Sequence, residues 1–264
     1  IIFDVQDVGA RFYTFLSTLH FMMETCANLG ISVLVLDRPN PNGHYVDGPI
    51  LDLEYSSFVG MHPVPIVHGM TVGEYAKMIN GEGWLAGGIQ CDLTVIPVQN
   101  YTHQSVYELP IKPSPNLPNA KAINLYPSLC LFEGTHVSMG RGTETQFQVF
   151  GSPFLEHPDY AYEFTPMPNV GAKYPVHENK LCKGLNLQNQ DTLDYIELKW
   201  LIDAYQNTSD KSAFFNPFFT KLAGQKILQE QIETGWTADQ IRKSWREGLE
   251  TYKLLRAPYL LYPL

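Results

Sequence analysis

The chain has 264 residues, of which 44% are hydrophobic, 12% aromatic and only 17% charged. Such a chain can bury a large core, which excludes global disorder, and it is long enough for one large domain or two ordinary ones. Its 27 acidic residues outnumber its 18 basic ones, for a formal net charge of −9. This balance argues against nucleic acid or an anionic membrane as the main partner. No apolar run approaches the roughly 18 residues that a membrane span needs.

Predicted strands and helices alternate in the first part of the chain. Residues 1–5 form a short apolar run that predicts a buried strand. Residues 15–29 place apolar side chains at helical spacing, and Gly30 supplies a stop signal. Residues 31–36 are almost wholly apolar, which is typical of a parallel strand covered on both faces. Because the sequence opens inside a buried strand, we expect it to be part of a longer protein.

The same alternation continues beyond these elements. Residues 64–67 are another candidate strand. Thr71 and Glu74 have the spacing of a capping box, which predicts the start of a helix that ends near Gly81. We assign Glu74 to this structural role. Residues 92–98 predict a further strand, and the whole rhythm predicts an open, mostly parallel α/β sheet.

A proline-rich segment interrupts this rhythm. Residues 109–118 contain four prolines and cannot form a regular helix or a central strand. We therefore place a domain boundary inside this segment, giving domains at residues 1–112 and 113–264. Its polar side chains are expected to line a cleft, since ligand sites favour domain interfaces.

The second part of the sequence is less regular and becomes helical toward its end. Short strand patterns mix with glycine-rich and threonine-rich segments before the helical patterns begin. The predicted strands are residues 145–150, 161–168 and 184–188, and the predicted helices are residues 194–205, 217–234 and 238–255, the last capped by Thr237.

The cysteines and the missing motifs exclude several classes of protein. The four cysteines are widely scattered with no C-x-x-C pair, which favours buried thiols over a zinc site or a dense disulfide framework. No P-loop, H-E-x-x-H or G-x-S-x-G motif is present. Residues 81–87 are glycine-rich but follow a helix instead of a strand, so an NAD site is poorly supported. We expect no cofactor and no metal.

Polar side chains are densest just after the first predicted strand. Asp4, Gln6, Asp7, Arg11 and Tyr13 offer acidic, amide, guanidinium and phenol groups within a few residues. They lie where a parallel strand ends and a helix begins, which is the edge where open α/β sheets bind ligands. A carboxylate beside an arginine is expected to stay ionised. The alternative is that Asp7 caps the helix and pairs with Arg11.

Two further groups of polar residues are expected at the same edge. Arg38 and Asn40 follow the second predicted strand in a loop fixed by prolines, and each could hold a sugar hydroxyl or a carboxylate. The alternative is a plain turn rich in Pro, Asn and Gly. His68 lies at a predicted strand end, where a ligand contact and a local hydrogen bond are equally compatible with its position.

The second dense group lies in the later half of the sequence. Glu133, Ser138, Arg141 and Thr143 stand among glycines that allow close approach of the backbone to a ligand. The alternative is a glycine-rich turn with a surface arginine. We interpret the group as part of a binding or catalytic site.

Six stretches of the sequence occur together in one order: DVQDVGARFYTF, LDRPNPNG, DGP, FVGMHPVPIVHGMTVGE, SPNLP and LFEGTHVSMGRGT. In combination they resemble the exo-β-N-acetylmuramidases of the NamZ type, a bacterial family first catalogued as a domain of unknown function. The resemblance spans nearly the whole chain. Several motifs in register are far more specific than any one of them alone.

The resemblance implies a fold and a reaction. The implied fold is a Rossmann-like, mostly parallel domain, truncated here at its N-terminus, joined to a smaller α/β or α+β domain with a cleft between them. The implied reaction releases N-acetylmuramic acid from the non-reducing ends of peptidoglycan fragments. Family members carry a further segment before the first motif, including a P-E-H-G sequence whose Glu is a leading catalytic candidate. Met139 stands where the family pattern suggests an acidic residue.

Glycoside cleavage normally needs two carboxyl groups, one to protonate the leaving oxygen and one to act on the far face of the sugar. Asp7 and Glu133 are our candidates. The guanidinium of Arg11, Arg38 or Arg141 could pair with the lactyl carboxylate that distinguishes muramic acid from glucosamine. The predicted substrate-binding residues are Asp4, Gln6, Arg11, Tyr13, Arg38, Asn40, His68, Asn116, Ser138, Arg141 and Thr143.

The predicted function is therefore a peptidoglycan-recycling glycosidase whose partner is a cell-wall saccharide. The substrate class suggests a periplasmic or secreted protein. The first alternative is a cell-wall saccharide-binding protein without turnover, because the same residues would serve it. A different hydrolase on the same scaffold is a further alternative, since a fold alone does not determine function.

Overall fold

The computed structural model describes residues 1–264 and divides them into two compact units. The first unit comprises Ile1–Tyr107 together with Arg246–Leu264, and the second comprises Glu108–Trp245. The division falls just before the proline-rich segment. The last nineteen residues belong to the first unit, whereas the sequence analysis assigned all of residues 113–264 to the second domain.

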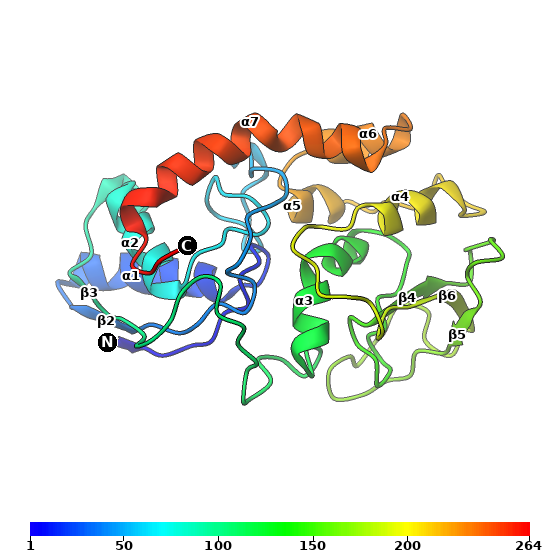
Figure 1. The fold of residues 1–264 in the computed structure, drawn as a ribbon, viewed down its shortest axis with the longest axis horizontal. Coiled ribbons are helices and arrows are strands. Elements are labelled where there is room, and N and C mark those ends of the chain that lie inside the picture. Colours follow the sequence, from blue (N-terminus) through cyan, green and yellow to red (C-terminus); the bar gives the residue numbers. More distant parts are fainter. The chain divides into compact units, whose positions relative to one another are not determined.

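The first unit contains a three-stranded parallel sheet (Figure 1). Its strands β1 (Ile2–Phe3), β2 (Val33–Leu36) and β3 (Leu93–Ile96) pair in that order. The helices α1 (Phe15–Leu29) and α2 (Val72–Gly81) pack against the sheet and each other. The predicted parallel α/β sheet is confirmed.

The two faces of this sheet differ in burial. Phe3, Val33 and Val35 are buried in the core formed with α1 and α2. On the opposite face Ile2 is 63% exposed and Ile96 is 46% exposed. The prediction that the strand at residues 31–36 is covered on both faces is therefore wrong within these residues, because both helices pack on the same face.

The helix ends follow from local sequence. Gly30 ends α1 in the left-handed conformation and donates its backbone N–H toward Ala27 and Cys26. At the start of α2, Thr71 Oγ1 accepts the Glu74 N–H at 3.3 Å and Glu74 Oε2 accepts the Thr71 N–H at 2.8 Å. The predicted capping box is confirmed.

The candidate strand at residues 64–67 does not form. Val67 instead makes isolated bridges to Ala10 and Asp47, and no ladder extends from them. The remaining short elements of this unit are 3-10 turns: η1 (Leu53–Tyr55), η2 (Ala86–Gly88) and η4 (Ala257–Tyr259).

The second unit contains a small antiparallel sheet. Its strands β4 (Val149–Ser152), β5 (Tyr162–Phe164) and β6 (Cys182–Asn186) pair in the order β4-β6-β5. The helix α3 (Ala120–Leu129) precedes them and continues into the 3-10 turn η3 (Cys130–Gly134). The helix α3 was not predicted, because the prolines before it and the one inside it obscure its helical pattern.

Four helices complete the chain: α4 (Lys199–Gln206), α5 (Phe219–Ala223), α6 (Ile227–Glu233) and α7 (Ala238–Arg256). One long helix was expected where α5 and α6 lie. Gly224 adopts a left-handed conformation with φ of 74° and separates the two.

All four cysteines are buried and none is disulfide-bonded. No helix is both long enough and apolar enough to cross a membrane.

Candidate active site

Asp7 follows β1 and is almost completely buried, at 5% exposure. Its Oδ2 accepts the backbone N–H of Gly9 at 2.7 Å, while its Oδ1 makes no hydrogen bond. Burial raises the pKa of this carboxyl from 3.8 to about 7, although the N–H groups of Gly9 and Val8 oppose the rise. Asp7 can therefore both hold and release a proton near neutral pH, which suits an acid–base group.

This result corrects the expectation that a neighbouring arginine keeps the carboxylate ionised. Arg11 is buried and donates through Nη1 to the carbonyls of Pro49 and Val64, at 2.9 and 2.7 Å. Burial lowers its pKa to about 9, so it stays charged at neutral pH. Arg11 therefore links two loop segments through their backbone carbonyls. The pKa of Asp7 is determined mainly by its burial.

His68 faces Asp7 across a short gap. Its Nε2 lies 3.9 Å from Asp7 Oδ2, and its Nδ1 accepts the Met70 N–H at 3.3 Å. The latter bond assigns the ring proton to Nε2, on the side of Asp7. Burial lowers the pKa of His68 to about 3, so its imidazole is neutral. The Nε2–H of this neutral imidazole therefore faces the Asp7 carboxyl without a hydrogen bond.

Asn40 packs against the loop that carries Asp7. Its Nδ2 donates to the Met70 carbonyl at 2.9 Å and its Oδ1 accepts the Asn42 N–H at 2.8 Å. Gly9, with φ of 78°, packs on it so closely that a Cβ there would lie 2.1 Å from Asn40 Oδ1. The polar atoms of Asn40 are thus engaged by the backbone, which gives this predicted substrate-binding residue a shaping role.

Replacing Gly9 by alanine is expected to lower the free energy of unfolding by about 2–3 kcal/mol and to reduce activity further by displacing Asp7. The control is Gly87→Ala, because Gly87 also has positive φ but no atom within 4 Å of its Cβ position. The free energy of unfolding of Gly87→Ala should fall by only about 1 kcal/mol. Urea unfolding of both variants measures the difference, and equal losses would contradict the close contact.

The remaining predicted residues of the first unit lie nearer the surface. Arg38 Nε donates to Asp4 Oδ1 at 2.7 Å in a partly exposed ion pair. Gln6 donates to the carbonyls of Asp7 and Pro39. Tyr13 is half-buried, and desolvation raises its pKa. These contacts tie the segment after β1 to the loop after β2, as expected for two neighbouring strand ends.

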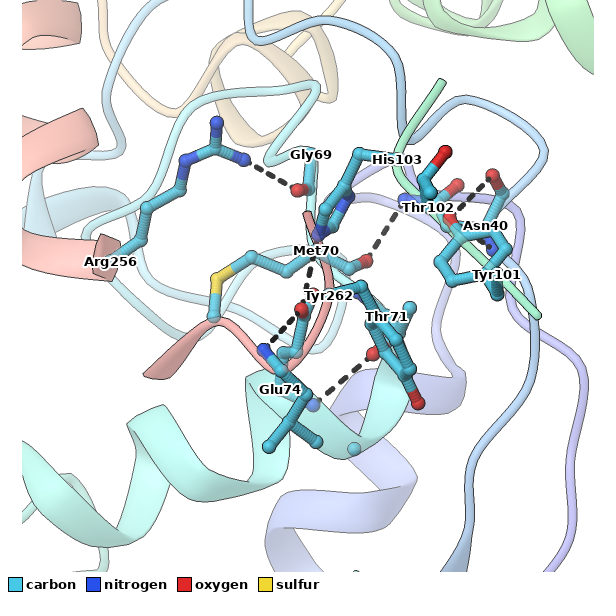
Figure 2. A network of polar contacts seen from close by, with 12 residues as sticks. Asn40, Gly69, Met70, Thr71, Glu74, Tyr101, Thr102, His103, Arg256 and Tyr262 are labelled. Carbon is cyan, nitrogen blue, oxygen red and sulfur yellow. Dashed lines mark hydrogen bonds and ion pairs between the residues drawn. The ribbon is translucent and has the colours of Figure 1, made fainter. Parts of the chain in front are cut away.

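Glu74 is at the centre of a polar network that the sequence only partly predicts (Figure 2). Besides the Thr71 N–H, its carboxyl accepts His103 Nε2 at 3.0 Å and the Leu261 N–H at 2.8 Å, both at Oε1. Glu74 is completely buried. It therefore joins the start of α2 to two distant segments of the same unit, beyond its capping-box role.

Asp37 fastens the same region from the end of β2. Its carboxyl accepts the hydroxyls of Thr71 and Tyr262 and the N–H groups of Gly73 and Arg38. Burial raises its pKa, and these four donors oppose the rise. Because both of its carboxyl oxygens accept hydrogen bonds from the protein, we assign Asp37 a structural role.

A second feature of the first unit is a buried pair of histidines that sequence analysis did not single out. His20 Nδ1 and His62 Nε2 lie 2.9 Å apart, and His62 Nδ1 lies 3.1 Å from the Tyr75 hydroxyl. Trp84 stacks on His62 and lines a cavity of about 310 Å³ beside them. Burial lowers the pKa of both histidines, so both are neutral.

In the second unit, Glu133 and Arg141 line a cavity of about 370 Å³. Arg141 Nη1 lies 3.2 Å from Glu133 Oε1. Burial raises the pKa of Glu133, and the guanidinium of Arg141 opposes this rise. Ser138, Met139 and residues 171–176 form the rest of the wall. A carboxyl paired with an arginine at the wall of a cavity can bind or act on a polar ligand.

The other predicted residues of this unit support the cavity wall. Asn116 Nδ2 donates to the Gly171 carbonyl at 2.7 Å. Thr143 donates to the Gly140 carbonyl at 2.7 Å and shapes the turn that carries Arg141. Ser138 lines the cavity and also bridges to Gly151 on β4. The structure thus brings Glu133, Ser138 and Arg141 together around one cavity, with Asn116 and Thr143 behind its wall.

The fold is a two-unit α/β protein, and each unit carries an acidic group whose pKa burial raises, which is the kind of group that glycoside hydrolysis uses. The family described as "Exo-beta-N-acetylmuramidase NamZ, N-terminal" matches residues 1–121, and the one described as "Exo-beta-N-acetylmuramidase NamZ, C-terminal" matches residues 124–262. The chain belongs to the NamZ family of exo-β-N-acetylmuramidases.

Similar proteins agree with this assignment. The chain is 34% identical over 283 residues to the peptidoglycan beta-N-acetylmuramidase NamZ of Bacillus subtilis, covering 99% of this chain and 67% of that protein. The crystal structure of a DUF1343 family protein from Bacteroides fragilis, 54% identical, superposes with a TM-score of 0.95 over 99% of this chain and 75% of that one. A second B. fragilis DUF1343 structure, 24% identical, shares the fold with a TM-score of 0.82, covering 99% of this chain and 74% of that one. The predicted family and fold class are confirmed.

Proposed function

We propose that this protein releases N-acetylmuramic acid from the non-reducing ends of peptidoglycan fragments, as part of cell-wall turnover and recycling. The observation that carries the proposal is the buried Asp7 carboxyl, with a pKa of about 7 and one unbonded oxygen, in a chain of this family. The name of the B. subtilis relative supports the substrate class. We further propose, from this substrate class, that the protein acts in the periplasm or outside the cell.

The two acidic groups suit different roles in this reaction. Asp7 is protonated in a large fraction of molecules at neutral pH, which suits the acid that protonates the leaving oxygen. Glu133, in the second unit, has a pKa that burial raises and the Arg141 guanidinium holds down, and it is our second candidate for a catalytic carboxyl. The family's upstream Glu, outside this chain, is a further candidate for either role.

The test is an assay of a chromogenic β-N-acetylmuraminide against the matching N-acetylglucosaminide. Both the 264-residue chain and an N-terminally extended version are measured, together with Asp7→Asn and Glu133→Gln variants. We expect selective cleavage of the muraminide, with a loss of about a hundredfold or more in kcat for either variant.

The possible outcomes separate the alternatives. Cleavage only by the longer product would place an essential group upstream, and cleavage by the short chain would assign the chemistry to its own residues. Saccharide binding without cleavage by any version would favour the non-catalytic binding protein. Equal cleavage of both glycosides would contradict the proposed specificity.

A further inference from the structure

One of three arginines was expected to bind the lactyl carboxylate of muramic acid, and all three already have partners. Arg11 is buried and bound to backbone carbonyls. Arg38 is paired with Asp4, and Arg141 with Glu133. Part of each guanidinium is therefore already committed to another partner, and a substrate carboxylate would have to share the positive charge with it.

The cavity beside Glu133 contains one further cation. Lys173 lines this cavity, is exposed, and takes part in no ion pair or side-chain hydrogen bond of the structure. Its neighbour Tyr174 also lines the cavity, and 91% of it is exposed. An unpaired ammonium and an open aromatic ring therefore stand side by side in the sequence at the wall of a cavity that holds an acidic group.

Hydrogen bonds hold the backbone just before Lys173 and Tyr174. The Gly171 carbonyl accepts Asn116 Nδ2 at 2.7 Å and Arg141 Nη2 at 3.5 Å. Asn169 and Ala172 exchange backbone hydrogen bonds of 2.9 and 3.2 Å. A side chain at Gly171 would meet Asn116 Oδ1 at 2.6 Å, which shows how closely the two segments approach.

The same backbone is also fastened at its end. His177 adopts a left-handed conformation with φ of 61°, and its Nε2 lies 2.5 Å from the His136 carbonyl and 3.3 Å from the Ser152 hydroxyl. A Cβ on Gly142, in the turn after Arg141, would lie 2.7 Å from the Pro175 ring. Lys173 and Tyr174 are therefore exposed side chains on a firmly held segment, which lowers the entropy cost of using them to bind a ligand.

We propose that Lys173 and Tyr174 are the specificity-determining residues for the acidic sugar. The Lys173 ammonium binds the lactyl carboxylate, and the Tyr174 ring packs on the apolar face of the pyranose. This assignment leaves Arg141 free to stay on Glu133 throughout. It rests on the proposed function, because it names the groups that recognise the substrate of that same reaction.

The test compares two chromogenic muraminides, one with a free lactyl carboxylate and one with the carboxylate converted to an amide. For Lys173→Gln we expect a loss of about tenfold or more in kcat/KM on the carboxylate substrate, mainly through KM, and no change on the amide. For Tyr174→Ala we expect similar losses on both. The matched control is Lys180→Gln, which removes an exposed charge nearby but outside the cavity and should change neither.

The outcomes distinguish the two proposals. The inference about Lys173 is overturned if Lys173→Gln keeps the wild-type preference for the carboxylate substrate, or if its kcat/KM falls equally on both substrates. Either outcome leaves the muramidase function standing. If the wild type cleaves no muraminide, the proposed function fails. In that case calorimetric binding of N-acetylmuramic acid decides the inference: a Kd at least tenfold weaker in Lys173→Gln supports it, and an unchanged Kd or no binding overturns it.

Discussion

Replacing Asp7 by asparagine is expected to remove most activity and yet to make the protein more stable at pH 8. The carboxyl is buried with a pKa of about 7, against 3.8 in its ordinary environment. At pH 8 the folded protein must hold this group as a buried anion, which is costly. Asparagine keeps an oxygen that can accept the Gly9 N–H but carries no charge.

The sign of the pH dependence follows from proton linkage. Because the pKa of Asp7 is higher in the folded state, the folded state binds more protons between pH 4 and 7, and wild-type stability from this group falls as the pH rises through that window. The stabilisation by Asp7→Asn should therefore be near zero at pH 4, grow up to pH 7 and level off above it. Its ceiling is about 4 kcal/mol.

Urea unfolding of wild type and variant from pH 4 to 8 measures this difference. The control is Glu54→Gln, which neutralises an exposed carboxyl of the same unit and should shift stability by less than about 0.5 kcal/mol at every pH. A difference between wild type and Asp7→Asn that does not change with pH would show that the pKa of Asp7 is ordinary.

Removing the Glu74 carboxyl is expected to cost about 3–5 kcal/mol of unfolding free energy. In Glu74→Ala the N–H groups of Thr71 and Leu261 and the imidazole of His103 lose their acceptor in a fully buried place. Glu74→Gln should lose less unfolding free energy than Glu74→Ala. Its amide oxygen can still accept hydrogen bonds from His103 and Leu261, and only the Thr71 N–H loses its acceptor, because it then faces the amide NH2 group.

Unfolding midpoints and hydrogen exchange at Leu261 test this network. The control is Glu82→Ala, because Glu82 also holds the C-terminal segment, through a single bond of 2.6 Å to the Tyr259 hydroxyl, but is only partly buried. It should cost about 1 kcal/mol or less. If the unfolding free energy of Glu74→Ala lay within 1 kcal/mol of the wild-type value, the stabilising role of the Glu74 network would be contradicted.

Local chemistry explains which elements could be predicted. The helix at Phe15–Leu29 was predicted with the bounds that the structure has, because its apolar spacing and its terminal Gly30 act within a few residues. The capping box of α2 is likewise a contact between near neighbours. Residues 64–67 have the sequence pattern of a strand but do not form one. No neighbouring strand pairs with them, and Val67 makes only isolated bridges.

The sequence alone was sufficient to determine the parallel α/β sheet, the family, and the two polar groups around Asp7 and Glu133. Only the tertiary structure decided what those groups can do. The pKa of Asp7 depends on how completely other segments desolvate it, and the predicted arginines were engaged by partners that no motif names.

Long-range contacts explain the rest. The end of α7 belongs to the first unit because the Tyr252 hydroxyl and the Arg256 guanidinium bind the His68 carbonyl, and Arg256 also binds that of Gly69. No periodicity or spacing in the sequence encodes a bond between residues so far apart. Periodicity and caps therefore determine the elements, whereas burial and pairing between distant segments determine protonation, available charge and the geometry of the site.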